Sequence, residues 1–249
     1  MDATLKPLNH SEEWIARIVP GKSFADIGGI GENASNERVT FAHAAGASSC
    51  VMADLTPTSH PEWEVFRKKC TSLGMPAFKE LGGVDITSPE SLKRVGPVDV
   101  VYSTGILYHL PSPPNALWSL HSIVGDYLIT NTINFPNKVA NEFGTVELPD
   151  CGVLFLPAMT DTERKVIGRY YQDKFGSQPG WKDLDHMAPL PHDLGKPQYV
   201  EGGKLSFQPN WFYYSDNAFR ALLRLCRFEI VDEWKWQDSN LHVLCRRLP

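Results

Sequence analysis

The chain has 249 residues, with 24 Lys and Arg against 29 Asp and Glu, and so carries a formal charge of −5. Proteins that bind nucleic-acid phosphates normally carry a basic surplus, so this balance argues against a nucleic-acid partner. The composition, 42% hydrophobic and 21% charged, is that of a globular protein and excludes disordered and fibrous classes. An α/β domain commonly runs to about 250 residues, so we expect one domain over residues 1–249.

The N-terminal region shows no targeting or membrane signal. Glu12, Glu13 and Arg17 interrupt its apolar positions, which leaves no apolar stretch of signal-peptide or membrane-spanning length. We therefore expect a cytoplasmic protein without a membrane partner. The cysteines are scattered and include no Cys-x-x-Cys pair, so neither a zinc site nor a redox couple is expected.

Strand-like and helix-like segments alternate through the first half of the chain, which predicts a parallel sheet with helices on both faces. The expected strands are residues 23–27, 49–53, 77–81, 98–102 and 127–132. The expected helices cover residues 36–46, a segment that starts at the capping box Ser59-x-x-Glu62, and a segment that Pro113 opens and that includes Val124.

The C-terminal segment predicts one more helix and a strand pair. Ser215 or Asp216 can cap a helix whose expected inner face is Ala218, Leu222 and Leu225. The expected strands are residues 228–236 and 241–246. Their link is too short for a parallel crossover, which needs about a dozen residues, so the pair is expected to be antiparallel.

Residues 134–210 break the alternation, because they are rich in Pro, Gly, His and aromatic residues around one helix at the capping box Thr160-x-x-Glu163. We expect an insertion after the fifth strand that lies above the sheet as a substrate-binding lid. His186 and His192 stand near several Asp residues, but their spacing fits no recognised metal site. We therefore expect a solvated loop or substrate contact there, and no metal.

Aromatic residues gather where the insertion rejoins the fold. The set is Tyr199, Phe207, Trp211, Phe212, Tyr213 and Tyr214. These side chains could wall an apolar or aromatic substrate, or they could form the core of the lid itself, and the sequence leaves both interpretations open. Trp211 and Tyr213 are the candidate substrate-binding residues of this set.

Acidic residues and glycines follow the expected strands at the edge where an open parallel sheet binds ligands. The first strand runs into Asp26-Ile27-Gly28-Gly29, and glycines there let the backbone approach a ligand closely. The second ends at Asp54, whose carboxylate can accept hydrogen bonds from both hydroxyls of a ribose. Asp85 can accept from an adenine amine while Ile86 packs on the purine face.

Together, Asp26-Ile27-Gly28-Gly29, Asp54, Asp85 and residues 98–110 resemble the successive motifs of class I S-adenosylmethionine-dependent methyltransferases. The resemblance covers residues 23–132 and again 211–246. It implies a Rossmann-like, seven-stranded, mostly parallel sheet with helices on both faces and an antiparallel last strand. It also implies S-adenosylmethionine as the cofactor.

The resemblance places Asp26 and Gly28 at the methionine portion of the cofactor, Asp54 at the ribose and Asp85 at the adenine. The family's loop usually reads acid-x-Gly-x-Gly-x-Gly, whereas Ile30 and Glu32 occupy the second and third glycine places here. The loop is either one residue shorter, with Gly31 in a shifted role, or follows a different path. The expected cofactor-binding residues are Asp26, Gly28, Gly29, Gly31, Asp54, Leu55, Asp85, Ile86, Ser103, Thr104 and Gly105.

His109 follows the fourth expected strand at the mouth of the crevice and is the candidate catalytic base, because an imidazole can take the proton of a hydroxyl or phenol. A histidine that only orders the loop or packs against the cofactor is the competing interpretation. Tyr108 is expected in the wall of the substrate site. We therefore predict O-methylation of a small molecule. A homodimer is the one protein assembly that we expect.

Three alternatives remain open. Residues 105–119 resemble bacterial enzymes that modify tRNA wobble uridine by carboxymethyl transfer. An acidic chain without a basic cluster does not favour binding of tRNA phosphates, however. Gly29-x-Gly31-x-x-Ala34 satisfies a looser nicotinamide fingerprint, and Tyr170 with Lys174 supplies the Tyr-x-x-x-Lys pair of short-chain reductases. The chain could also bind S-adenosylmethionine without transferring a methyl group.

Overall fold

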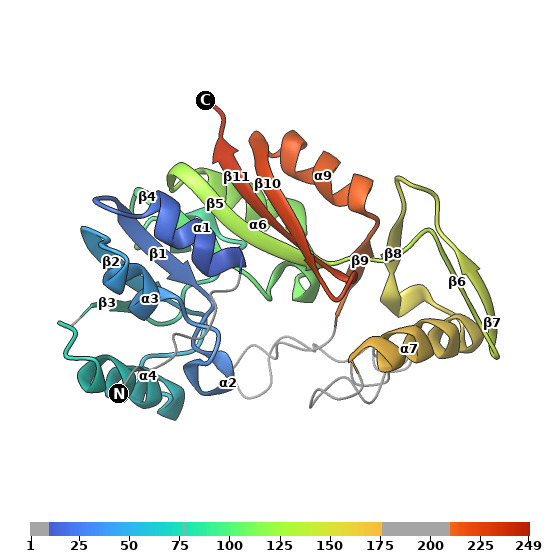
Figure 1. Cartoon of the computed structure of the whole chain (residues 1–249), viewed down its shortest axis with the longest axis horizontal. Coiled ribbons are helices and arrows are strands. Elements are labelled where there is room, and N and C mark those ends of the chain that lie inside the picture. The colour runs from blue at the N-terminus through green and yellow to red at the C-terminus, as the bar shows by residue number, and fades with distance from the viewer. Residues whose placement is uncertain (1–9, 77, 176–209) are drawn as a thin grey trace, which may run out of the picture.

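The computed structural model describes residues 10–76, 78–175 and 210–249, and its centre is a seven-stranded sheet in the order β10-β11-β5-β4-β1-β2-β3 (Figure 1). Strands β1 to β5 pair in parallel, whereas β11 runs antiparallel to both β5 and β10. The predicted mostly parallel sheet with an antiparallel last strand is therefore confirmed. The strands are β1 (Ser23–Ile27), β2 (Ser49–Ala53), β3 (Lys79–Leu81), β4 (Val98–Ser103), β5 (Val124–Ile133), β10 (Phe228–Trp236) and β11 (Asn240–Arg247).

Helices bury both faces of this sheet. Neighbouring residues of one strand enter different cores: Phe24 packs with Trp14 of α1 and Trp63 of α4, and Ala25 belongs to the core that α6 and α9 cover. Strands covered on both faces read as continuous apolar runs, which is why the central strands were predictable. The helices are α1 (His10–Ile18), α2 (Gly31–Ala34), α3 (Val39–Ala44), α4 (Pro61–Ser72), α5 (Pro89–Leu92), α6 (Pro113–His121), α7 (Asp161–Phe175) and α9 (Asp216–Leu225).

Three details of the predicted helices are wrong. The side chain of His60, and not that of Ser59, caps α4 by accepting from the Glu62 amide. Val124 begins β5, because α6 already ends at His121. Leu225 of the predicted inner face of α9 is 74% exposed, whereas Ala218 and Leu222 do pack against the core, which Phe219 and Leu223 enter fully.

After β5 the chain leaves the sheet and forms the hairpin of β6 (Lys138–Asn141) and β7 (Gly144–Glu147), and then β8 (Val153–Phe155). β8 pairs with β9 (Phe212–Tyr214) on the return path, beside the sheet in Figure 1. Thr160 and Glu163 make the predicted reciprocal cap of α7, with Glu163 Oε2 accepting from the Thr160 amide at 2.7 Å. This segment has a hydrophobic core of its own, which includes Val146, Val166 and Tyr171.

Helix α7 is fastened to the turn between β10 and β11. The Tyr170 hydroxyl lies 2.9 Å from Ser239 Oγ, and Lys174 Nζ donates to the Gln237 carbonyl at 3.2 Å. The Tyr171 hydroxyl donates to the carbonyl of Asn134 at 3.0 Å. These contacts connect the insertion to the end of the sheet. No helix in the described part of the chain has both the length and the apolar character needed to cross a membrane.

Candidate functional site

The carboxyl ends of β1, β2 and β4 meet at one edge of the sheet. The strand order reverses between β1 and β4, because the chain first builds outward through β2 and β3 and then continues on the other side of β1. An open parallel sheet binds ligands in the crevice outside such a switch point. The sequence-predicted residues Asp26, Asp54 and Gly105 all stand at this edge, immediately before or after the ends of their strands.

Two glycines shape the turn after β1. Gly28 has φ +93°, and a Cβ added there would lie 2.0 Å from Cδ1 of Ile106. A Cβ at Gly29 would lie 2.8 Å from both carboxylate oxygens of Asp26. Gly31 has open space around its Cα, since a Cβ there meets nothing within 4 Å, and Ile30 is fully buried in the core. A ligand can therefore approach the backbone closely at Gly28 and Gly29. The second glycine place of the motif is filled by Ile30, whose side chain belongs to the core.

Asp54 joins the loops that follow β1 and β2. Its Oδ2 accepts from the Ile30 amide at 3.1 Å and its Oδ1 from the Thr56 amide at 2.8 Å. The residue is 2% exposed, and burial raises the pKa of its carboxyl. The Thr56 side chain also hydrogen-bonds to this carboxylate. A carboxylate offers about four acceptor sites, so acceptor capacity remains for a ribose hydroxyl.

Asp26 is the second buried acid, 1% exposed beside the glycine turn. Its Oδ2 accepts from the Arg38 amide at 2.6 Å, whereas Oδ1 is buried and has no hydrogen-bond partner within the described residues. Burial raises the pKa of this carboxyl well above its usual range. A buried acceptor without a donor is costly, so its presence at the glycine turn fits a bound group that carries N–H donors, such as the methionine end of S-adenosylmethionine.

Asp85 and Ile86 occupy the loop after β3. Asp85 Oδ1 accepts from both the amide and the hydroxyl of Thr87, at 2.8 and 2.7 Å, so this carboxylate already orders its own loop. Ile86 is buried in the core on the α6 side, and Leu55 is half-buried. Adenine contact by these residues stays a prediction.

The segment after β4 is held by a chain of side-chain amides that sequence reasoning missed. Gly105, at φ +77°, donates its amide to Asn131 Oδ1 at 2.6 Å, and Asn131 Nδ2 donates to Asn240 Oδ1 at 2.8 Å. Ser103 is fully buried and donates to the Ile27 carbonyl at 3.2 Å, so its side chain ties β4 to β1. Thr104 is half-buried between them.

His109 lies in the short helix η1 (Leu107–His109), directly after this segment. It is half-buried, and its ring lies 4.4 Å from the ring of Tyr108, centroid to centroid. The Tyr108 carbonyl accepts from the Trp211 amide at 2.7 Å. The structure therefore brings the candidate base and the candidate wall residues Tyr108 and Trp211 together where the insertion meets the sheet.

Tyr213 is part of the insertion's own core. It is fully buried, its ring packs edge-on against Tyr171 at 5.0 Å, and its hydroxyl accepts from Asn210. Burial raises the pKa of this phenol, which keeps it protonated. Of the two interpretations of the aromatic cluster, Tyr213 follows the core interpretation, whereas Trp211 is half-buried and stacks on Phe155 at 6.0 Å. Tyr199, Phe207, His186 and His192 lie outside the described residues.

No protein-family model matches this sequence, and no curated protein matches it. Solved structures do match the fold. Magnesium protoporphyrin IX methyltransferase from Synechocystis PCC 6803, with bound S-adenosylhomocysteine, is 14% identical, with a TM-score of 0.51 over 98% of this chain and 90% of that one. An S-adenosylmethionine-dependent methyltransferase from Mesorhizobium loti is 15% identical, with a TM-score of 0.50 over 95% and 96% of the two chains. The chain has the class I methyltransferase fold.

A third similar structure is the N-terminal domain of EvdMO1 in the presence of S-adenosylhomocysteine and D-fucose, 13% identical, with a TM-score of 0.51 over 97% of this chain and 84% of that one. The structural similarity establishes the methyltransferase fold, but at such low sequence identity it does not identify the substrate. Within this fold, the buried acids Asp26 and Asp54 flank the glycine turn at the switch point.

Proposed function

We propose that the chain is an S-adenosylmethionine-dependent methyltransferase that acts on a hydroxyl or phenol of a small molecule. The observation that carries this proposal is the pair of buried acids on either side of the turn at Gly28 and Gly29. Asp54 offers acceptor capacity for a ribose hydroxyl, and Asp26 offers an unsatisfied acceptor for the amino-acid end. The bound S-adenosylhomocysteine of the Synechocystis enzyme, which has the same fold, supports the choice of cofactor.

The chemistry needs few protein groups. S-adenosylmethionine, when bound, supplies a methyl carbon attached to a positively charged sulfur, so the protein mainly aligns the acceptor in line with that bond. Tyr108 and Trp211 would wall the acceptor beneath the insertion, whose residues 134–210 we assign as the lid. His109 would take the proton from the acceptor oxygen as the new carbon–oxygen bond forms.

The nicotinamide alternative has less support. Tyr170 and Lys174 would have to reach a bound nicotinamide, yet both are engaged at the β10–β11 turn. Asp26 would also place a carboxylate beside a pyrophosphate, which is electrostatically unfavourable. The formal charge of −5 likewise favours a small acceptor over tRNA.

The direct test is to incubate the protein with S-adenosylmethionine and a panel of phenols, alcohols, amines and thiols, and to measure S-adenosylhomocysteine. Time-dependent S-adenosylhomocysteine that requires a hydroxylated acceptor supports the proposal. Turnover confined to amines or thiols would contradict O-methylation. A protein that binds the cofactor and turns over no acceptor would instead favour the binding-only alternative.

Replacing His109 with alanine is expected to lower the turnover number by about 100- to 10,000-fold, the usual contribution of a general base, and to leave cofactor affinity within about 2-fold. His43→Gln is the matched control, because His43 lies on α3 and packs against Phe78. Turnover and cofactor affinity are measured separately, by product formation and by calorimetry. Loss of cofactor affinity in His109→Ala would make His109 a wall residue and not a base.

A further inference from the structure

Two buried asparagine side chains connect the loop after β4 to the beginning of β11. Asn131 of β5 is 3% exposed and Asn240 of β11 is 8% exposed. Asn131 Oδ1 accepts from the Gly105 amide at 2.6 Å, and Asn131 Nδ2 donates to Asn240 Oδ1 at 2.8 Å. A backbone N–H can only donate, so the Gly105 amide sets the orientation of both side-chain amides. An exposed glycine is therefore held in place by two buried residues.

The position of Gly105 affects both sides of the proposed site. The next residue, Ile106, packs on the glycine turn, where its Cδ1 lies 2.0 Å from the position that a Cβ of Gly28 would take. Tyr108 and His109 follow directly in η1. A displacement of Gly105 would therefore move the loop both against the cofactor turn and at the candidate base.

The other end of this connection is the turn between β10 and β11. Asn240 follows directly after the turn residues. Gln237 has φ +49° and Asp238 has φ +56°, both in the left-handed region that favours glycine. Side chains keep such a conformation only where the surrounding structure holds them. Ser239 is fully buried, and its carbonyl accepts from the Asn134 amide at 3.1 Å, at the beginning of the insertion.

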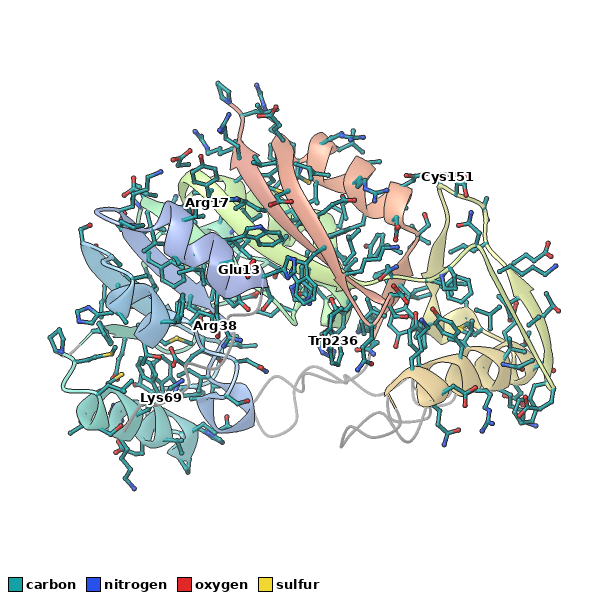
Figure 2. All side chains as sticks on the ribbon, in the orientation of Figure 1. Glu13, Arg17, Arg38, Lys69, Cys151 and Trp236 are labelled. Carbon is teal, nitrogen blue, oxygen red and sulfur yellow. The ribbon has the colours of Figure 1, made fainter. Side chains whose placement is uncertain are left out.

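Helix α7 of the insertion also holds this turn. The Tyr170 hydroxyl lies 2.9 Å from Ser239 Oγ. Lys174 Nζ donates to the Gln237 carbonyl at 3.2 Å. Figure 2 shows Trp236, the last residue of β10, at the end of the hairpin that points toward α7. A series of short contacts therefore leads from α7 through the turn and the two asparagines to the loop after β4.

We propose that Asn131 and Asn240 position the loop after β4 for methyl transfer, and that this position depends on the contact between α7 and the β10–β11 turn. The inference rests on the proposed function, which places the cofactor and the acceptor on either side of that loop. Both asparagines act through Gly105 and are positioning residues. An acceptor that alters how α7 meets the turn then alters cofactor affinity, and by linkage the cofactor alters acceptor affinity by the same factor.

The competing interpretation is that the two side chains only satisfy each other's buried polar atoms. Hydrogen exchange of the Gly105 amide, followed by NMR without ligand and relative to the β1 amides, separates the two. Asn131→Leu removes the acceptor and should speed this exchange about 10-fold or more. Asn131→Asp keeps an acceptor for the amide and should restore most of the protection.

The double variant Tyr170→Phe/Lys174→Met tests the contribution of α7. Both side chains are only half-buried, so the variant is expected to fold. It releases the turn from α7 and should speed exchange of the Gly105 amide roughly 3- to 30-fold. Tyr127→Phe is the matched control and should change nothing, because Tyr127 lies near the other end of β5, where its hydroxyl accepts from Arg246 at 3.4 Å.

Calorimetry with S-adenosylhomocysteine relates the connection to cofactor binding. The double variant should bind this ligand roughly 3- to 30-fold more weakly, and Asn131→Leu at least as weakly, whereas Asn131→Asp should stay close to the wild type. Unchanged Gly105 exchange in the double variant would overturn the dependence on α7. Faster exchange with unchanged affinity would overturn the positioning role.

A wild-type protein that binds no S-adenosylhomocysteine would contradict the proposed function, and the role in methyl transfer with it. The exchange measurement needs no cofactor. It would still show whether the contacts of α7 reach Gly105, so the two failures can be told apart.

Discussion

Replacing Asp54 with alanine is expected to weaken binding of S-adenosylmethionine at least about 100-fold, because charge-assisted hydrogen bonding to the ribose is lost. The change also frees the amides of Ile30 and Thr56, which now share this carboxylate. The loops after β1 and β2 would then separate at the point where the cofactor has to lie. Calorimetry with S-adenosylhomocysteine measures the loss without interference from turnover.

Asp54→Asn separates these two contributions. An asparagine keeps one acceptor oxygen and the size of the side chain, so it should retain part of the loop contact and lose the charge. We expect its affinity to lie between those of the wild type and Asp54→Ala. An Asp54→Ala protein that melts cooperatively and binds S-adenosylhomocysteine as tightly as the wild type would contradict the ribose assignment.

Replacing Gly28 with alanine is expected to destabilise the fold by about 3 kcal/mol or more, because strain at positive φ adds to steric overlap. Gly28 has φ +93°, and the new methyl group would meet Ile106 Cδ1 at 2.0 Å. Ile106 is buried and precedes η1, so moving it would also displace the loop that carries His109. The free energy of unfolding from urea titration measures the effect.

Gly31→Ala is the control for this prediction. Gly31 begins α2 and a Cβ there meets nothing within 4 Å, so alanine should change the free energy of unfolding by less than about 1 kcal/mol or increase it. The contrast tests whether Gly28, in contrast to Gly31, stands where the turn has no room for a side chain. Equal destabilisation by both substitutions would contradict the geometry of the turn.

Much of the sheet could be predicted because the hydrophobic pattern of each strand matches the burial of that strand in the folded sheet. β2 and β10 have the predicted bounds, since their apolar or alternating residues end at clear turn signals. The antiparallel end of the sheet followed from the short link between β10 and β11. The face of α9 was predicted only in part: Ala218 and Leu222 pack against the core, but Leu225 is exposed and Phe219 and Leu223 are the fully buried residues. Both sets satisfy the same helical spacing, so the spacing could not separate them.

The acids of the candidate site could be predicted because each stands close to the carboxyl end of a strand: Asp26 near the end of β1, Asp54 directly after β2 and Asp85 in the loop after β3. Arg38, Asn131 and Asn240 could not, since their positions depend on which strands become neighbours. Asn131 supports the Gly105 amide from the next strand, and Arg38 reaches the site from the loop after α2. Residues in loops follow no periodic sequence pattern, so the position of a loop side chain near the site is known only from the structure.

The measurement that tests the central claim most directly is a thermal shift with S-adenosylmethionine, S-adenosylhomocysteine, NADH and NADPH in parallel. A ligand at a hundredfold excess over its dissociation constant stabilises a protein by roughly 2.7 kcal/mol, or about 5 to 11 °C for a chain of this size. We predict shifts of this size with the two S-adenosyl compounds and none with the nicotinamides. A shift with NADH or NADPH alone would contradict the account and make Tyr170 and Lys174 the residues to replace next.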